Sequence, residues 1–354
     1  MPKTVVDIAV VGAGIVGSLV ATEVLRRRPH ATVAILDRGF AGDGASRRSA
    51  GLHIPRGLTP TVRSWTRLSE NYYRELVTER PDLGIRSLTM NVLTRSTHPE
   101  RLSEIYLGRP VPAREGAPEP LDRLPSDATA WSVAGAQHAD VQSVTAALTA
   151  RLRHSAAVHE GVEVSGLTEA DDHVALTTAT GRTVHAREVV LAPGPWLSHR
   201  AWRPLVAELP VRVKKVVALH VDAVPPSRSP TVVFHDEDAF LLPLPDRGHW
   251  LFSYTSHDWD VRPETLPSAL TSADLDEGRD VLRSWAPHLA DRVHSGRVFC
   301  DAYAASGEPD VRALTPRIVF AGAANGSGYR LGPAIATRTA DLLARSADRE
   351  GLTQ

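Results

Sequence analysis

Three glycines near the N-terminus have the spacing that brings a backbone close to a phosphate group. They form the pattern Gly12-x-Gly14-x-x-Gly17, and the acidic residue Asp37 follows the last of them by twenty positions. In this pattern the first glycine permits a tight turn, the second lets the backbone approach a pyrophosphate, and the third lets a helix pack closely on a strand. A helix N-terminus then faces the phosphates, while the carboxylate accepts hydrogen bonds from a ribose. The sequence therefore predicts a dinucleotide site.

The segments around these glycines are the ones that such a site requires. Residues 5–11 are apolar and rich in β-branched side chains, residues 15–28 place apolar side chains at helical spacing, and residues 31–36 form a second apolar run that ends at Asp37. A lone glycine pattern also occurs in purely structural turns. A strand, a helix and a second strand in this order form the βαβ unit in which the pattern binds dinucleotides.

The rest of the chain alternates between helical and strand-like patterns. Prolines multiply between residues 85 and 140, where we expect part of a second lobe with an irregular surface excursion. The periodicity predicts helices over 64–79, 141–154, 275–285 and 333–347, a β meander over 162–190, and strands over 211–221, 239–244, 250–254 and 317–321.

Three downstream stretches resemble the cofactor-binding segments of a known enzyme family. They are residues 42–52 (GDGASRRSAGL), 191–196 (LAPGPW) and 320–334 (FAGAANGSGYRLGPA). In this order and at this spacing they are similar to the flavin-contacting segments of the D-amino acid oxidase family, which includes glycine and sarcosine oxidases. The resemblance covers nearly the whole chain. It implies that the dinucleotide is FAD rather than NAD.

The resemblance also implies a set of cofactor contacts. Ser46, Arg47 and Arg48 would lie beside the phosphates and the ribityl chain, where arginine offers forked donors to phosphate oxygens; a solvated arginine pair is the alternative. Val164 would contact adenine through its backbone, or simply pack in the core. Backbone N–H groups at a helix start would suit the negative charge of a reduced flavin. The expected cofactor residues are Gly12, Gly14, Ile15, Val16, Gly17, Asp37, Arg38, Ser46, Arg47, Arg48, Val164, Gly194, Trp196, Cys300, Gly326, Gly328, Tyr329, Arg330 and Leu331.

Four residues are expected at the substrate. In the sarcosine oxidase branch a basic residue at the place of Arg330 binds the substrate carboxylate, and a guanidinium would do so through two parallel hydrogen bonds. A surface arginine in the last loop is the alternative. Tyr254, His257 and Tyr303 lie on strands or loops that should face the pocket, with packing or surface positions as the alternative.

Two departures from the family pattern concern the substrate. The arginine of the family's GLRP motif is absent from residues 301–304 (DAYA), and the lysine that activates oxygen in sarcosine oxidases has no counterpart in residues 250–254 (WLFSY). Both departures argue against a simple glycine or sarcosine oxidase. His53 and Arg56 follow the flavin loop and could reach either face of the flavin, or serve in packing.

Cys300 is the single cysteine of the chain. It lies roughly where sarcosine oxidases carry a cysteine that is covalently linked to the flavin, so a covalent link is one interpretation. The other is a small buried hydrophobe, the commonest role of a lone cysteine. No intrachain disulfide can form, which fits a reducing compartment.

These elements predict an α/β fold. We expect a doubly wound, Rossmann-like FAD-binding domain of the glutathione reductase type, joined to a substrate-binding domain built on an antiparallel sheet. The site would lie between the lobes, at the carboxyl ends of the parallel strands. The FAD domain is expected to use residues 1–85, 141–200 and 295–354, and the substrate domain residues 86–140 and 201–294.

By resemblance, the reaction is the oxidation of a C–N bond in an amine or amino acid. A hydride would pass to the flavin, water would hydrolyse the imine, and oxygen would reoxidise the flavin to give hydrogen peroxide. One alternative is a dehydrogenase of a 2-hydroxy acid or amine that uses another electron acceptor. Others are a non-catalytic flavoprotein and an NAD-only enzyme. The unusual stretches at 100–130 and 300–312 favour a specialised, biosynthetic substrate.

Composition argues against several other classes. The chain carries 40 basic and 41 acidic residues, a balance that gives no sign of a nucleic-acid or acidic-membrane partner. Histidines are scattered without metal-ligand spacing, so no metal is expected. No apolar run approaches the roughly 20 residues of a membrane helix, and no signal-peptide pattern is present. We expect a cytoplasmic monomer or small homo-oligomer whose partners are its small-molecule substrate and an electron acceptor.

Overall fold

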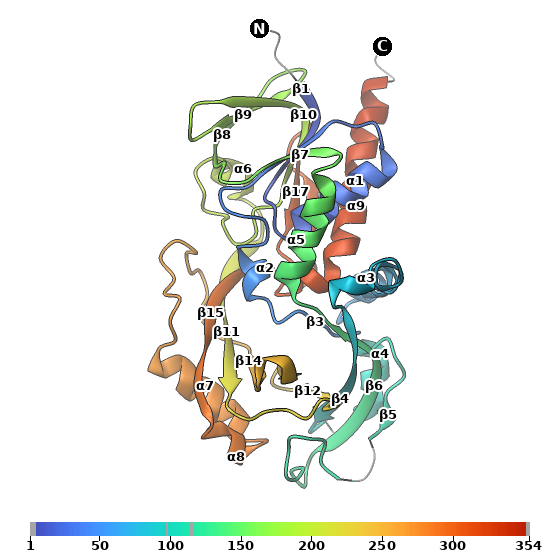
Figure 1. The fold of residues 1–354 in the computed structure, drawn as a ribbon, viewed down its shortest axis with the longest axis vertical. Helices are drawn as coiled ribbons and strands as arrows, with labels where there is room; N and C mark the ends of the chain where they lie inside the picture. Colours follow the sequence, from blue (N-terminus) through green and yellow to red (C-terminus); the bar gives the residue numbers. More distant parts are fainter. Residues whose placement is uncertain (1–4, 97, 114–115, 352–354) are drawn as a thin grey trace.

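The chain folds around two β-sheets, which lie one above the other in Figure 1. The computed structural model describes residues 5–96, 98–113 and 116–351. The described ends of the chain lie together at the top, beside the first sheet. Short connections at the level of α2 (Ala45–Arg48) and α3 (Pro60–Glu79) join the two halves.

The first sheet has a parallel centre, with the strand order β16-β17-β10-β1-β2-β7. The β16/β17 and β9/β10 pairs are antiparallel, and β8 extends the sheet beyond β9. Val11 at the end of β1 is in register with Leu36 and Leu191 on the two neighbouring strands. The three strands therefore deliver their following turns to one edge. The strands are β1 (Val5–Val11), β2 (Val33–Leu36), β7 (Ala156–His159), β8 (Val164–Glu169), β9 (Val174–Thr178), β10 (Thr183–Leu191), β16 (Asp310–Ala313) and β17 (Ile318–Gly322).

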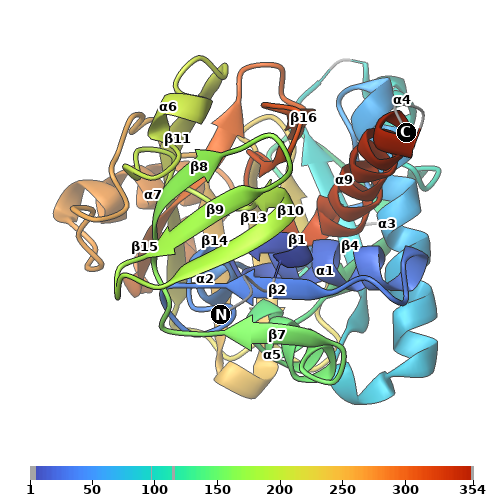
Figure 2. The ribbon, with the colours of Figure 1, turned by 90° about the horizontal axis from the view of Figure 1, so that it is seen from above.

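Helices and the β8–β9 ribbon cover opposite sides of this parallel centre (Figure 2). Helix α1 (Ile15–Arg27) packs against α5 (Val141–Leu152) and α9 (Gly328–Gly351). Because both faces are covered, residues 8–11 of β1 are all buried, as the continuous apolar run in the sequence indicates.

Helix α9 begins at Gly328, earlier than the predicted start at residue 333. The prediction placed Pro333 in the first helical turn, where proline is common. In the structure Pro333 lies inside the helix, and it has no N–H to offer to the carbonyl of Tyr329. The hydroxyl of Tyr73 on α3 donates to that carbonyl instead, at 2.5 Å. A tertiary contact thus satisfies the acceptor that proline leaves open.

The second sheet is antiparallel apart from the β12/β4 pair, with the order β15-β11-β14-β13-β12-β4-β6-β3 and β5 beside β6. Its strands are β3 (Leu52–His53), β4 (Arg86–Thr94), β5 (Val111–Pro112), β6 (Thr129–His138), β11 (Val211–Val221), β12 (Thr231–Phe234), β13 (Ala239–Leu244), β14 (His249–Tyr254) and β15 (Val293–Ala304). The remaining helices are α4 (Leu102–Ile105), α6 (Arg203–Val206), α7 (Ser272–Arg283) and α8 (Pro287–Ala290), and the 3-10 turns are η1 (Pro81–Leu83), η2 (Pro99–Arg101) and η3 (Pro245–Arg247).

The predicted α/β fold, a Rossmann-like parallel sheet beside an antiparallel sheet, is confirmed. The proposed residue boundaries of the two domains stay a prediction. Two stretches of the expected FAD domain belong to the second sheet instead: residues 52–53 in β3, which pairs with β6, and residues 295–304 in β15, which pairs with β11. Strand β15 crosses from one half to the other, and its end lies beside the turn that follows β17.

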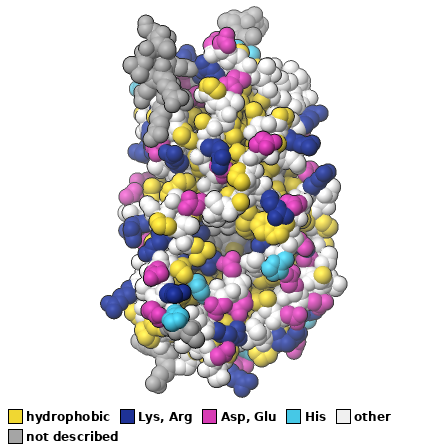
Figure 3. Space-filling view, turned by 180° about the vertical axis from the view of Figure 1, so that it is seen from behind, with side chains coloured by type: hydrophobic (Ala, Val, Ile, Leu, Met, Phe, Trp, Pro, Cys, Tyr) yellow, Lys and Arg dark blue, Asp and Glu magenta, His cyan; other side chains and the backbone are white. Residues whose placement is uncertain are grey.

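The surface carries both signs of charge. On the face in Figure 3, basic and acidic side chains are interspersed and no large area of one sign is visible. None of the described helices is long and apolar enough to cross a membrane.

Candidate active site

An elongated cavity of about 420 Å³ runs between the two sheets. One end is formed by the turns that follow β1, β2 and β10, and the other by the inner faces of β11, β13, β14 and β15. The loop that leads into α9 lies between them. The four segments that the sequence analysis selected, at 12–17, 42–52, 191–196 and 320–334, all contribute to its wall.

The glycine turn closes one end of the cavity. A side-chain carbon on Gly12, whose φ is +108°, would lie 2.3 Å from the carbonyl oxygen of Ala192. A side-chain carbon on Gly17 would lie 1.9 Å from the carbonyl oxygen of Gly12. Both positions therefore need glycine for the turn itself. Gly14 is different, because a side-chain carbon there would meet only the Ser46 hydroxyl, at 3.4 Å, and would otherwise fill cavity space. It leaves the α1 N-terminus open to a ligand.

Asp37 organises the same end of the cavity. Its carboxylate accepts hydrogen bonds from the backbone N–H groups of Ala13, at 2.7 Å, and Gly39, at 2.8 Å. Burial raises the pKa of this carboxyl, although the two hydrogen bonds favour its charged form. Next to it the guanidinium of Arg38 stacks over the Trp196 ring at 4.3 Å. A carboxylate and a flat cationic–aromatic stack beside a glycine turn suit the ribose and base of a dinucleotide.

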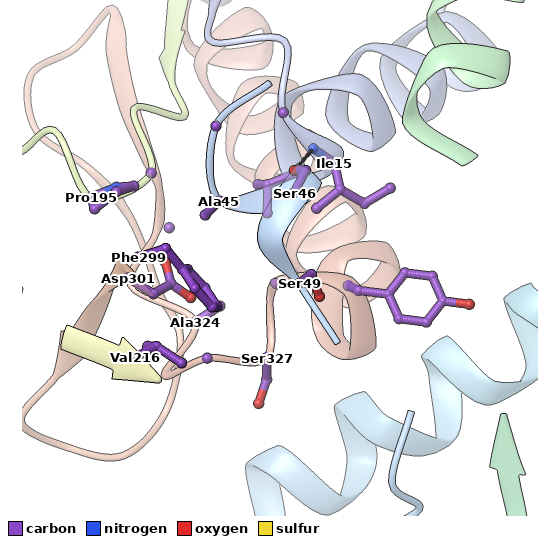
Figure 4. Close-up of a pocket in the computed structure, with 18 of the residues that line it drawn as sticks. Ile15, Ala45, Ser46, Ser49, Pro195, Val216, Phe299, Asp301, Ala324 and Ser327 are labelled. Atoms are coloured by element: carbon purple, nitrogen blue, oxygen red, sulfur yellow. Dashed lines mark hydrogen bonds between the residues drawn. The ribbon is translucent and has the colours of Figure 1, made fainter. Parts of the chain in front are cut away.

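Most of the expected cofactor residues lie on the wall of this cavity. Ser46 does so and also accepts a hydrogen bond from the N–H of Ile15 at 3.0 Å, which ties α2 to the start of α1 (Figure 4). The expected residues that line the cavity are Gly12, Gly14, Ile15, Val16, Gly17, Asp37, Arg38, Ser46, Val164, Gly194, Trp196, Gly326, Gly328, Tyr329 and Arg330.

Four expected cofactor residues do not line the cavity: Arg47, Arg48, Leu331 and Cys300. Helix α2 directs Ser46 inward, but Arg47 is exposed and pairs with Asp43 at 3.3 Å. Arg48 does not line the cavity either. Neither arginine is therefore placed to contact the cofactor phosphates, as the resemblance had implied. Leu331 is 2% exposed and packs in the core of the first half. The resemblance located this loop correctly but could not tell which way each side chain points.

Cys300 also lies away from the cavity. Along β15 alternate residues point to opposite faces, and Phe299, Asp301 and Tyr303 are the ones that line the cavity. Cys300 is on the other face and 5% exposed, and burial raises the pKa of its thiol to about 12. A cysteine needs access and thiolate character to form a bond. The geometry therefore favours the interpretation of Cys300 as a small buried hydrophobe over the covalent link.

A Cys300→Ser variant tests this directly. Acid precipitation should leave the yellow chromophore in the supernatant for both the wild type and the variant, because no bond joins the cofactor to the protein. The measurement is the visible spectrum of supernatant and pellet. A coloured wild-type pellet that becomes colourless in the variant would contradict the geometry.

Arg330 is held firmly at the start of α9. Its guanidinium donates to the carbonyl oxygen of Arg56, to Thr66 Oγ1 at 3.3 Å and to Ser327 Oγ at 2.8 Å. Burial, together with the positive charge of Arg56, lowers its pKa to about 9. It is therefore cationic at neutral pH, and it lies on the cavity wall, as expected for a residue that meets the substrate.

Arg56 and Asp238 form an ion pair on the same wall. Arg56 donates to the carboxylate of Asp238, and the hydroxyl of Thr255 donates to that carboxylate at 3.1 Å. Asp238 occupies the turn between β12 and β13 with a φ of +47°. Although burial opposes both effects, each partner favours the charge of the other, so the pKa of Arg56 is raised and the pKa of Asp238 is lowered.

Lys214 is a further cation on this wall. It is 7% exposed, and its ammonium lies 5.0 Å from the centre of the Trp259 ring and 5.3 Å from that of Tyr303. Burial lowers its pKa. Within the described parts of the chain, no carboxylate lies at ion-pair distance from its ammonium. The neighbouring Lys215 differs, because Asp258 and Asp274 both pair with it.

Lys214, Asp238 and Asp301 were not predicted as site residues from the sequence. A signal for Lys214 was present, since lysine occurs at only three positions of the chain and two of them are consecutive within an apolar strand. No local pattern distinguished Asp238 or Asp301. Each lines the cavity because of a turn or a strand register that only the assembled sheet defines.

Of the other expected substrate residues, Tyr254 and Tyr303 line the cavity and His257 does not. Tyr303 faces the cavity, whereas the Tyr254 hydroxyl donates to the carbonyl oxygen of Asp274 at 2.9 Å, so only its ring serves as wall. His257 is exposed and does not line the cavity, which corrects that expectation. His53 is fully buried behind the wall, where burial lowers its pKa to about 3, while Arg56 reaches the wall.

Comparisons with known proteins agree with this architecture. The family described as "FAD dependent oxidoreductase" matches residues 7–342. A glycine oxidase from Geobacillus kaustophilus (strain HTA426) is 28% identical over 211 residues, a match that spans about half of each chain, 54% of this one and 55% of the relative.

Solved structures match over almost the full length. Glycine oxidase from Geobacillus kaustophilus matches with 22% identity and a TM-score of 0.78, over 96% of this chain and 95% of that one. L-proline dehydrogenase from P. horikoshii matches with 18% identity and a TM-score of 0.82, over 98% of this chain and 94% of that one. NikD, described as an unusual amino acid oxidase essential for nikkomycin biosynthesis, matches with 18% identity and a TM-score of 0.78, over 96% of this chain and 94% of that one. At these identities the likeness concerns the fold.

The residues of the cavity fit the cofactor of that family. Gly14 leaves the α1 N-terminus free for a pyrophosphate, Asp37 lies where a ribose would bind, and the loop before α9 lines the cavity between its two ends. The match covers nearly all of the chain, and the fold and the cradle agree with it. This chain belongs to the DAO family of FAD-dependent oxidoreductases.

Proposed function

We propose that this enzyme oxidises the C–N bond of an amine that also carries a carboxylate, such as an amino acid. FAD would supply the redox chemistry as the hydride acceptor, with oxygen as the final oxidant and hydrogen peroxide as its product. Water hydrolyses the imine product. The relatives named above as amino acid oxidases support this reaction class. The unusual residues around the cavity favour a specialised substrate.

The observation that carries the proposal is the charge of the substrate end. Arg56, Arg330 and Lys214 place three cationic groups on this part of the cavity wall, against the carboxylates of Asp238, which is ion-paired with Arg56, and Asp301. A low-dielectric cavity with excess positive charge binds an anion favourably. A planar guanidinium matches a carboxylate through two parallel hydrogen bonds.

Each residue then has a task in positioning. Arg330 is fixed by its hydrogen bonds to Arg56, Thr66 and Ser327, so it loses little freedom when a carboxylate arrives. Lys214 contributes a second positive charge from the opposite sheet. The rings of Tyr254 and Tyr303 exclude water from the space between them. Since bound FAD accepts the hydride, the chief contribution of these side chains is orientation.

A matched substrate panel tests the proposal. Under anaerobic conditions the purified holoenzyme is mixed with L- and D-amino acids, N-methylated and cyclic amino acids, and the same compounds lacking the carboxylate. At least one carboxylate-bearing amine should bleach the visible flavin band, and its carboxylate-free partner should react at least roughly 30-fold more slowly, equivalent to about 2 kcal/mol. Equal rates for the two partners would contradict the assignment of the cationic wall.

Admission of air then separates oxidase from dehydrogenase. Rapid return of the flavin band with formation of hydrogen peroxide supports the oxidase. Slow return, together with fast reoxidation by an added quinone or dye, supports the alternative of a dehydrogenase of a 2-hydroxy acid or amine. If no amine, amino acid or hydroxy acid bleaches the bound flavin, the protein is a non-catalytic flavoprotein.

A further inference from the structure

Asp301 is a half-buried carboxyl on the cavity wall that the proposed reaction does not use. It lies on β15 between Phe299 and Tyr303, and all three line the cavity. Figure 4 shows it beside Phe299 and Ala324, with Ser46 and Ser49 on the other side. Tyr303 is bridged to Ala324, so this part of the strand lies directly against the loop that leads into α9. Asp301 therefore faces the space between two segments that would hold the flavin.

No cation neutralises this carboxyl. Lys214 is its direct cross-strand partner on β11, but the ammonium of Lys214 lies with the rings of Trp259 and Tyr303 instead. No arginine, lysine or histidine of the described residues forms an ion pair with Asp301. Its partners are the backbone N–H groups of Ala302, at 2.8 Å, and of Gly326.

The other ionisable groups around Asp301 are few. On β15 they are Tyr303, whose pKa burial raises far above neutrality, and Cys300, whose thiol points to the opposite face. From α2 and from the segment before α7, Arg48 and Glu264 act on Cys300 rather than on Asp301. The loop at 324–328 contains no ionisable side chain. Burial raises the pKa of Asp301 to about 6, so small changes in nearby charge alter its protonation near neutral pH.

We propose that Asp301 takes up a proton from solvent when the bound FAD is reduced, so that reduction of this enzyme is coupled to one more proton than the cofactor itself requires. Two electrons and one proton convert FAD to its anionic reduced form. With FAD held by the segments that line this cavity, that new negative charge would share the cavity with the carboxylate of Asp301, and like charges disfavour each other's presence. Protonation of Asp301 removes the conflict. The second proton forms the O–H bond of its carboxyl group.

The coupling is reciprocal. If reduction raises the affinity of Asp301 for a proton, then protonation of Asp301 favours reduction by the same factor. The cofactor should therefore become a stronger oxidant as the pH falls toward the pKa of Asp301. This inference rests on FAD binding but not on the identity of the substrate. Proton uptake by Asp301 can therefore fail while the proposed reaction stands, and the proposed reaction can fail while proton uptake by Asp301 stands.

The test is the midpoint potential of the bound FAD as a function of pH, from 5 to 9, measured against redox dyes with a chemical reductant. Each proton taken up per two electrons changes the reduction equilibrium tenfold per pH unit, which is about 30 mV for a two-electron couple. Just above pH 6 the wild type should show two protons per two electrons. Asp301→Asn should show one proton over the same range.

Tyr303→Phe is the matched control, because it changes the next cavity-facing residue of the same strand without removing Asp301. It should keep the two-proton slope. If Asp301→Asn loses FAD, Asp301→Gly replaces it, since glycine removes the side chain altogether. A wild-type slope of one proton throughout, or an unchanged two-proton slope in the Asp301 variant, would overturn the proposal.

Discussion

Arg330→Met should lower kcat/KM for a carboxylate-bearing substrate by roughly 100- to 1000-fold while the protein keeps its FAD. The reason is the loss of a buried cation that pairs with the substrate carboxylate, a change that costs about 2–5 kcal/mol in comparable buried charge pairs. Met fills a similar volume and leaves the apolar contacts of the stem in place. The measurements are steady-state kinetics with the substrate found in the anaerobic panel, and the ratio of bound FAD to protein.

Two controls separate binding from folding in this experiment. Arg330→Lys keeps the charge but not the fork, so it should give an intermediate loss. Arg47→Met removes an exposed arginine of the flavin loop that does not line the cavity, and it should leave kcat/KM within about twofold.

A substrate-independent readout is also available. Benzoate should perturb the flavin spectrum of the wild type, the uncharged benzamide should not, and Arg330→Met should lose the difference. If the variant binds benzoate as well as the wild type does, Arg330 is not the carboxylate anchor.

The sequence predicted the elements that depend on local pattern. β11 and β13 have the bounds that the alternation indicated, and β1, α1 and β2 form the expected βαβ unit. Glycine spacing located the dinucleotide end of the cavity because each glycine there meets a backbone atom or open cavity space, a constraint that acts over a few residues.

The residues around the substrate end could not be predicted in this way. Asp238 reaches Arg56 only because the turn between β12 and β13 lies beside the segment after β3, and these positions are far apart in the chain. Asp301 rather than Cys300 lines the cavity, because one step along a strand reverses the face of the sheet. A resemblance that fixes a segment to within a residue or two cannot settle which of two neighbours faces the cofactor.

Asp37→Ala should weaken FAD binding at least about 100-fold and lower the free energy of unfolding of the apoprotein by about 2–4 kcal/mol. The carboxylate accepts hydrogen bonds from Ala13 and Gly39, so its loss leaves two half-buried N–H groups without an acceptor, at about 1–2 kcal/mol each, in the lower part of the range for buried donors. The turns after β1 and β2 then lose the link that joins them beside the glycine pattern. FAD loses in addition the acceptor for its ribose hydroxyls.

Asp37→Asn distinguishes the two contributions. Its amide oxygen can still accept from one N–H group, but its NH₂ group faces the other donor, so the apoprotein should recover about half of the lost stability. FAD affinity should remain well below that of the wild type, because one carboxylate oxygen no longer accepts. Chemical denaturation of the apoprotein and titration of apoprotein with FAD measure the two quantities separately. If Asp37→Ala bound FAD within threefold of the wild type, the glycine turn alone would hold the cofactor, and the carboxylate would serve only to join the two turns.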